Sequence, residues 1–381
     1  MKHSGGATAR DMTEGDRTVS TSDRRIVLVL GPGRSGTSTM AGTLAMSGFD
    51  VPKAIAGKES NPAGFYEPRW VVNFHRGLLQ KADVRTLDAD PGAFEQMAPV
   101  LGDPEVRATL RTWLEQRLAE HSRLVIKDPR LVWFRDLWVD IAGELGQEPG
   151  FVFMLRHPSE VSSSRSEYYD AREVTAVGGW INVALMTERL TQGSPRALVH
   201  YPRLTADWRA EATRVRDLLG LHLDPAPEVT PHPVDDFIDP DLRRRQPGWD
   251  DSQVPQFLQA LGEATFRALA ELADHGDSVE RAARLDELRE EYRTLHSDAL
   301  DLVRAHTQRE RTAAVREVRR KARDSARQRA AASGEQGAQP SRRPAGRTPE
   351  QLRARVKELE SSWIPGAVRG RLSSLRRRSR S

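Results

Sequence analysis

The sequence predicts an α/β fold, in which helices cover a mostly parallel sheet. Two observations predict it: four short apolar runs have the length of buried strands, and helix-length segments separate them. Strands that alternate with helices form βαβ units, whose strands run parallel and whose crossovers are right-handed. The predicted strands are "RIVLVL" (25–30), "RLVIK" (123–127), "FVFMLR" (151–156) and "RALVHY" (196–201).

The segments between these runs have the spacing of helices, and two further helical patterns follow an irregular Pro- and Asp-rich stretch near 215–250. In the last pattern an apolar seam recurs at alternating steps of three and four residues. The seam predicts either a short coiled coil, which would make a homodimer through residues 285–306, or a helix that folds back on the body. Its members are Leu285, Leu288, Tyr292, Leu295, Ala299 and Leu302.

Composition separates an acidic body from a basic tail. Residues 304–381 carry 22 of the chain's 58 Lys and Arg but only 7 of its 54 Asp and Glu. The rest of the chain therefore carries 36 basic and 47 acidic residues. The absence of cysteine excludes disulfides and thiolate sites and fits a cytoplasmic protein. The polar start has no apolar segment of a signal peptide, and no apolar run reaches the ~20 residues of a membrane span.

These patterns predict five parts of the chain. We expect a disordered leader (1–23), an α/β domain (24–250), a helical extension (251–330), a linker (331–348) and a basic amphipathic tail (349–381). Trp363 and several apolar residues of the tail lie three or four apart among arginines, which is typical of a segment that binds an anionic membrane from the cytoplasmic side. Non-specific nucleic-acid binding and a solvated tail without a partner are the alternatives.

A glycine-rich loop, "GPGRSGTS" (31–38), follows the first predicted strand and precedes a helix. Such a loop directs backbone N–H groups toward one point, and the helix dipole adds positive potential there. Gly31 and Gly36 have the spacing of a P-loop, but Thr37 occupies the position of the P-loop lysine and Arg34 lies inside the loop. The loop therefore predicts a phosphate site that differs from that of an ATPase or GTPase.

A second anion site is predicted where the third strand ends. Arg156 stands at that strand end in "LRHPSEVSSSRSEYY", and Ser164 follows eight residues later. Arginine offers a permanent charge and a bidentate fork, and a serine two helical turns later adds a hydroxyl. Because ligands of open α/β sheets bind beyond the carboxyl ends of the strands, both sites are expected in one crevice.

Together these two motifs resemble those of the sulfotransferases that use 3′-phosphoadenosine 5′-phosphosulfate (PAPS). The segments "NPAGFYE" (61–67) and "KDPRL" (127–131) are similar to those of bacterial members that act on carbohydrate-like acceptors. The resemblance covers roughly residues 25–250. It implies a P-loop fold, PAPS as co-substrate and a hydroxyl of a carbohydrate or glycolipid as acceptor. Because a sulfuryl group carries less charge than a phosphoryl group, arginine and backbone donors suffice for its transfer and we expect no metal. We also expect no sequence-specific nucleic-acid partner.

The resemblance also implies roles for individual residues. The 3′-phosphate would be held by Arg156 and Ser164, and a basic element that closes over it would come from Arg243 or Arg244 of "LRRRQ" (242–246), where the match is loose. Many members of the family have lysine where Arg34 stands. The 5′-phosphosulfate would be held by Gly31, Arg34, Ser35, Gly36, Thr37 and Ser38.

Sulfuryl transfer needs positioning, charge stabilisation and a general base for the acceptor hydroxyl. In related enzymes the base follows the helix after the loop, where Glu67, Glu59 and His75 are the candidates, and Glu67 is our prediction. A carboxylate that only favours the start of the next helix is the alternative for Glu67. Arg34 would neutralise charge on the bridging oxygen, and Lys127 would orient either the donor sulfonate or the acceptor.

The sequence alone leaves two other functions open. The first is a nucleotide or small-molecule kinase with the same kind of loop, which Thr37 disfavours because the loop lysine is missing. The second is a non-catalytic scaffold at a membrane surface, in which the basic tail does the binding. The joint presence of Arg34, Arg156 and Ser164 argues against a scaffold.

Overall fold

The computed structural model describes residues 25–57, 64–169, 172–238, 248–250 and 252–334. The described residues form one sheet of four strands in the spatial order β2-β1-β3-β4, and every neighbouring pair is parallel. The strands are β1 (Ile26–Leu30), β2 (Leu124–Lys127), β3 (Gly150–Leu155) and β4 (Arg196–His200). The predicted parallel α/β fold is confirmed, and each strand matches its apolar run to within one residue at either end.

Helices fill the connections between the strands. Between β1 and β2 lie α1 (Thr37–Met46), α2 (Arg69–Ala82), α3 (Ala93–Leu101) and α4 (Pro104–Glu120). Between β2 and β3 lie a 3-10 turn, η1 (Leu131–Phe134), and α5 (Arg135–Glu144), and between β3 and β4 lie α6 (Pro158–Tyr169) and α7 (Glu173–Thr191). After β4 come α8 (Tyr201–Ala206), α9 (Trp208–Leu219), α10 (Gln256–His275) and α11 (Val279–Gly334).

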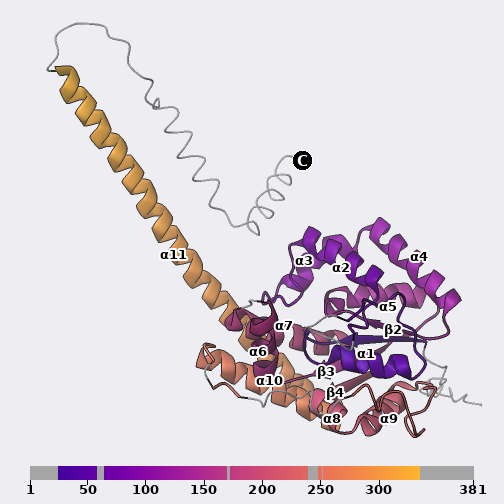
Figure 1. Ribbon diagram of the computed structural model, residues 1–381. Helices are drawn as coiled ribbons and strands as arrows, with labels where there is room; N and C mark the ends of the chain where they lie inside the picture. Colours follow the sequence, from indigo (N-terminus) through magenta and orange to yellow (C-terminus); the bar gives the residue numbers. More distant parts are fainter. Residues whose placement is uncertain (1–24, 58–63, 170–171, 239–247, 251, 335–381) are drawn as a thin grey trace, which may run out of the picture. The chain divides into compact units, whose positions relative to one another are not determined.

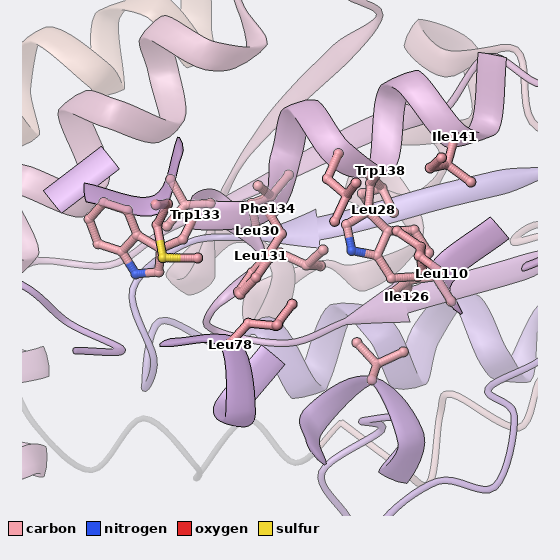
Figure 2. Close-up of a cluster of buried hydrophobic side chains, with 14 of the residues drawn as sticks. Leu28, Leu30, Leu78, Leu110, Ile126, Leu131, Trp133, Phe134, Trp138 and Ile141 are labelled. Atoms are coloured by element: carbon pink, nitrogen blue, oxygen red, sulfur yellow. The ribbon is translucent and has the colours of Figure 1, made fainter. Parts of the chain in front are cut away.

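The sheet has a hydrophobic core on each face because successive side chains of a buried strand point to opposite sides. Leu28, Leu30 and Ile126 point to the face covered by α2 to α5, where Trp133 and Trp138 are fully buried (Figure 2). Alternate residues of the same strands pack against α1 and α9 on the other face. Figure 1 shows α2 to α5 on one side of the strands and α8 and α9 on the opposite side. Burial on both faces explains why the strands are continuous apolar runs.

The strand order places the predicted loops at one edge. β1 lies between β2 and β3, so the chain moves to one side of β1 and later returns on the other. Parallel strands end at the same edge, and a crevice opens where the direction of winding changes. The segments that follow β1, β2 and β3 therefore meet beyond the carboxyl ends of these strands.

The contacts divide the chain into two units, residues 1–292 and 293–381. The start of α11 belongs to the first unit: Leu285 and Leu288 are fully buried, and the Tyr292 hydroxyl donates to the carbonyl of Ala89 over 2.6 Å. The apolar seam therefore folds back on the body as far as Tyr292, and these residues are not available for a coiled coil. A homodimer remains a prediction for the rest of the seam, Leu295, Ala299 and Leu302.

Candidate functional site

The glycine-rich loop has a backbone that requires two of its glycines. Gly31 and Gly36 have φ angles of 129° and 87°, which side chains disfavour. A Cβ on Gly31 would lie 2.7 Å from the Met154 carbonyl oxygen of β3, and one on Gly36 would lie 2.1 Å from the ring of Tyr201. The loop thus lies tightly between β3 and the start of α8, and α1 begins directly after it at Thr37.

Ser35, in the middle of the loop, is fully buried, and its Oγ has no hydrogen-bond partner among the described residues. Buried hydroxyls are nearly always hydrogen-bonded, because leaving one unsatisfied costs about 1–3 kcal/mol. The Ser35 N–H donates to the Pro32 carbonyl over 3.1 Å, which fixes the turn. A hydroxyl held in this position fits the binding of a phosphate oxygen.

Arg34 connects the two predicted anion sites. Its backbone has a φ of 79°, an unusual value for a residue with a side chain. Its Nε donates to Oγ of Ser164 over 2.9 Å, and its carbonyl oxygen accepts a hydrogen bond from Nη1 of Arg156 over 3.2 Å. The loop after β1 and the Arg156–Ser164 element after β3, 122 to 130 residues away in sequence, are therefore in direct contact.

Arg156 is held on three sides. Its guanidinium lies over the ring of Tyr201 at 4.7 Å and forms an ion pair of 3.5 Å with Glu160, one turn along α6. Its Nε is buried and, among the described residues, has no hydrogen-bond partner. A guanidinium with a buried donor still unused fits an oxyanion ligand, since arginine binds phosphate through two parallel hydrogen bonds.

Lys127 and Glu67 form an ion pair beside the loop. The Lys127 ammonium donates to Oε1 of Glu67 over 2.6 Å, to Oγ of Ser38 over 3.1 Å and to the Phe65 carbonyl over 3.3 Å. The side chains of Lys127 and Glu67 are 4% and 12% exposed. The ammonium group that the loop itself lacks is thus supplied at the start of α1 from the end of β2.

Tyr66, directly before Glu67, also has a left-handed backbone, with a φ of 50°. Its ring packs edge-on against Phe237 at 5.5 Å and lies next to Gly42 of α1, where a Cβ would come within 3.0 Å of it. Burial raises the pKa of the Tyr66 hydroxyl. The strained turn places Glu67 opposite Lys127. Unusual backbone conformations of this kind cluster at functional sites of proteins.

His75 lies in the core. The indole N–H of Trp138 donates to Nε2 of His75 over 3.0 Å, so Nδ1 carries the proton and donates to Asp128 over 3.1 Å. Burial lowers the pKa of His75 in spite of the hydrogen bond and charge of Asp128. Since both ring nitrogens are engaged and the side chain is fully buried, His75 has no nitrogen to offer an acceptor hydroxyl.

The carboxylate of Asp128 joins His75 to Arg130. Its Oδ1 accepts hydrogen bonds from the backbone N–H and from Nη1 of Arg130, over 2.9 and 2.8 Å. Burial alone would raise the pKa of Asp128, but the hydrogen bonds and charges of His75 and Arg130 outweigh burial and lower it. Asp128 is therefore a buried anion that fixes the turn after β2, the segment that carries Lys127.

Some predicted residues lie outside the described part of the chain: Glu59, Arg243, Arg244 and the tail. Two residues at the site were missed as candidates by the sequence analysis. Tyr201 supports both Gly36 and Arg156, and its place directly after the last strand was a usable signal. Arg165 lies against the loop, and its position next to Ser164 was the only signal for it.

Comparisons with known proteins give two similar structures. The sulfotransferase domain from the Synechococcus PCC 7002 olefin synthase is 19% identical, with a TM-score of 0.38, over 67% of this chain and 97% of that one. The sulfotransferase domain from the curacin biosynthetic pathway is 14% identical, with a TM-score of 0.36, over 67% of this chain and 99% of that one. At these values the likeness does not assign an activity.

No family model matches the chain, and no curated protein sequence matches it. Within the described ranges, no group of three or more His, Asp or Glu side chains is placed to hold a metal ion. None of the helices in the same ranges has the length and apolar character needed to cross a bilayer.

Proposed function

We propose that this chain is a sulfotransferase that moves a sulfuryl group from PAPS to a hydroxyl of a carbohydrate or glycolipid. The observation that carries the proposal is the contact between the two predicted anion sites, made by the hydrogen bond from Arg34 to Ser164. A nucleotide with phosphates at both its 3′ and 5′ positions needs two such sites next to each other. The buried, unused Ser35 Oγ and Arg156 Nε are the donors available to those phosphates.

In this proposal each side chain has one task. Arg156 and Ser164 bind the 3′-phosphate, while the loop N–H groups, Ser35 Oγ and Arg34 bind the 5′-phosphosulfate. Glu67 takes the proton of the acceptor hydroxyl as its oxygen bonds to sulfur and the bond from sulfur to the bridging oxygen breaks. Lys127 and Arg34 stabilise the negative charge that develops on the transferred group and on the departing phosphate.

Thr37 argues against the kinase alternative, but the structure supplies one feature that a kinase would need. Lys127 places an ammonium 3.1 Å from Ser38, close to where a loop lysine would act on ATP. This ammonium is already paired with Glu67, and a kinase offers no role for Arg156 and Ser164 at the neighbouring site. ATP is therefore the competing ligand in the decisive experiment.

Titration calorimetry in EDTA, without magnesium, tests the proposal with adenosine 3′,5′-bisphosphate and with ATP. We expect tight binding of the bisphosphate and weak binding of ATP. Equal affinity for the two nucleotides, or tighter binding of ATP once magnesium is added, would overturn the sulfotransferase assignment. Binding of neither nucleotide would leave the scaffold alternative.

The acceptor class is tested separately with ³⁵S-labelled PAPS and extracts of the host cell. We expect label in glycan or glycolipid fractions. Label confined to protein or to free small molecules would overturn the acceptor class and leave the donor assignment in place.

A further inference from the structure

The first turn of α6 packs against α10, a helix that lies beyond the part of the chain that resembles sulfotransferases. A Cβ on Gly262 of α10 would lie 3.4 Å from Cγ of Pro158, the first residue of α6. One turn later on α10, the ring of Phe266 meets the ring of His157 edge-on at 5.1 Å. α10 therefore contacts the two residues that directly follow Arg156 in the chain.

Polar contacts hold the imidazole of His157 at both nitrogens. Its Nδ1 accepts the backbone N–H of Ser159 over 3.3 Å and lies 2.7 Å from Oγ of Ser159, so in the neutral ring Nε2 carries the proton. This Nε2 lies 2.7 Å from Oε1 of Glu263 on α10. The same Oε1 accepts the indole N–H of Trp249 over 2.7 Å, and the Gly248 N–H donates to Oγ of Ser159 over 3.1 Å. His157 is buried among these partners.

The backbone of His157 connects the two halves of the second predicted anion site. Arg156 precedes His157 directly after β3, and Ser164 follows in α6. The carbonyl oxygen of His157 accepts the N–H of Val161 over 3.2 Å, a hydrogen bond of the first turn of α6. His157 thus lies where α6 leaves the strand. Its orientation sets how the Ser164 hydroxyl is placed relative to the Arg156 guanidinium.

The proposed function gives no task to His157 or Glu263. An apolar side chain would pack against Phe266 without the cost of burying an imidazole. The polar contacts add direction, because hydrogen bonds weaken steeply when they are misaligned. Groups that bind a ligand must be held within about 0.5 Å of the productive geometry, and a phosphate bound between an arginine and a serine is such a case.

We infer that His157 and Glu263 are positioning residues, through which α10 holds Arg156 and Ser164 in the geometry that binds a phosphate. The inference rests on the proposed function only for the identity of that phosphate, the 3′-phosphate of the nucleotide. It gives the helical extension a role in donor binding, which the proposed function leaves without one. Neither positioning residue contacts the nucleotide in this assignment.

Calorimetry of the full-length protein with adenosine 3′,5′-bisphosphate and with adenosine 5′-monophosphate tests the inference. The second ligand lacks the 3′-phosphate and so reports the rest of the nucleotide site. Glu263→Ala removes the acceptor that lies beside His157 and Trp249. We expect it to weaken bisphosphate binding by roughly five- to tenfold, less than the loss of Arg156 itself, and to change monophosphate binding less than about twofold.

His157→Phe is the second variant, which keeps a ring beside Phe266 and removes both nitrogens. We expect the same result from it as from Glu263→Ala. If His157→Phe folds poorly, Glu263→Ala decides alone, because the Glu263 side chain is 34% exposed and its loss leaves the core intact.

Three controls separate positioning from a loss of stability. Glu263→Gln keeps an acceptor oxygen in the same place and should bind both ligands within about twofold of the wild type. Glu271→Ala removes a carboxylate from an exposed position of the same helix. Leu288→Ala empties a fully buried position of α11 and lowers the stability of the protein. The last two variants should leave both affinities unchanged.

Wild-type affinity for the bisphosphate in either folded variant, Glu263→Ala or His157→Phe, overturns the inference and leaves the proposed function standing. An equal loss for the two ligands, or a loss of the same size in Leu288→Ala, also overturns it, because the whole nucleotide site would then be damaged. So does a loss in Glu263→Gln as large as that in Glu263→Ala. A wild-type protein that binds neither nucleotide overturns the proposed function and the inference with it.

Discussion

The ammonium of Lys127 lies 2.6 Å from Oε1 of Glu67 and also donates to Oγ of Ser38, at the start of α1, over 3.1 Å. Charged hydrogen bonds of this length are among the stronger interactions in proteins, and they hold both groups in a defined geometry. The pair brings a proton acceptor and a cation to the same edge of the sheet. General-base chemistry on a hydroxyl and stabilisation of a transferred anion need these two groups close together.

Glu67→Gln should separate binding from chemistry. Glutamine keeps the shape of Glu67 and an oxygen for Lys127, so affinity for adenosine 3′,5′-bisphosphate should stay within about twofold. Turnover should fall by about 10²-fold or more, as expected for the loss of a general base. Single-turnover transfer from labelled PAPS measures the effect, with Glu95→Gln on the exposed surface of α3 as control. Full activity of Glu67→Gln would move the base to Glu59.

Arg156→Ala should weaken bisphosphate binding by roughly ten- to a hundredfold, because a charged hydrogen bond to phosphate contributes about 1.5–3 kcal/mol. Binding of adenosine 5′-monophosphate, which lacks the 3′-phosphate, should change much less. The comparison of these two ligands by calorimetry assigns Arg156 to the 3′-phosphate. A similar loss for both ligands would show that Arg156 acts only by supporting the loop through the Arg34 carbonyl.

The stability of the protein should fall as the pH drops from about 6.5. Burial lowers the pKa of His75 below its unfolded value of about 6.5, so between these two values the unfolded chain binds the extra proton. The lowered pKa of Asp128 causes a second loss of stability, which begins only when the pH falls below the pKa of this carboxyl in the unfolded chain, about 3.9. Thermal unfolding between pH 5 and 8 measures the first effect.

His75→Gln is the control for this pH dependence. The glutamine amide offers a donor for Asp128 and an acceptor for the Trp138 indole but has no pKa in this range. His200, whose pKa is also lowered by burial, remains in both proteins. The difference between the two proteins in the slope of stability against pH is therefore due to His75. Equal slopes for the wild type and His75→Gln would contradict the prediction.

The strands and the loop were predictable because local rules determine them. "RIVLVL" is apolar at every position after its first residue, and the burial of β1 on both faces requires that pattern. Gly31 and Gly36 were readable because the loop needs left-handed φ angles there. Such features are determined by residues that are neighbours in the chain, so the sequence alone is enough to predict them.

The contacts of the site were not predictable, because they join residues that are far apart in the chain. Nothing local to Lys127 indicates that it bonds Glu67, 60 residues earlier, or that His75 is held by Trp138. The same holds for the apolar seam, whose two alternatives have identical heptad spacing. Only the contacts that Tyr292 and Arg289 make with Ala89 and Glu188 decide that the seam packs on the body as far as Tyr292.

Shortening the chain should locate the boundary of the folded body. Glu188 is 1% exposed, and its two oxygens bind Arg196 over 3.2 Å and Arg289 of α11 over 2.8 Å. A chain that ends at Ser278 loses Arg289 and the burial of Leu285 and Leu288, about 1.5–3 kcal/mol for each leucine. Urea unfolding should show this loss, whereas a chain that ends at Tyr292 should match the full-length protein. Equal stability of the two shortened chains would contradict the role given to α11.

The basic tail, residues 361–381, should bind anionic membranes. Trp363, Ile364, Val368, Leu372 and Leu375 fall mostly three or four apart, and six arginines follow Trp363. Each arginine near an anionic surface contributes about 1 kcal/mol, and a tryptophan suits the interface between lipid and water. An enzyme that acts on a lipid-linked glycan would gain from lying beside its acceptor, whereas nucleic acid offers such an enzyme nothing.

Liposome flotation measures this binding. Full-length protein should float with vesicles that contain phosphatidylglycerol and stay behind with vesicles of phosphatidylcholine alone, and a chain that ends at Ser333 should float with neither. Added salt should weaken the binding without abolishing it, because the apolar residues contribute as well. Equal flotation of both chains would place the membrane contact elsewhere, and flotation of neither would leave the tail solvated. Both results would remove the membrane from the account of the tail and leave the assignment of Arg34, Arg156 and Ser164 unchanged, since no step of that assignment uses residues beyond 292.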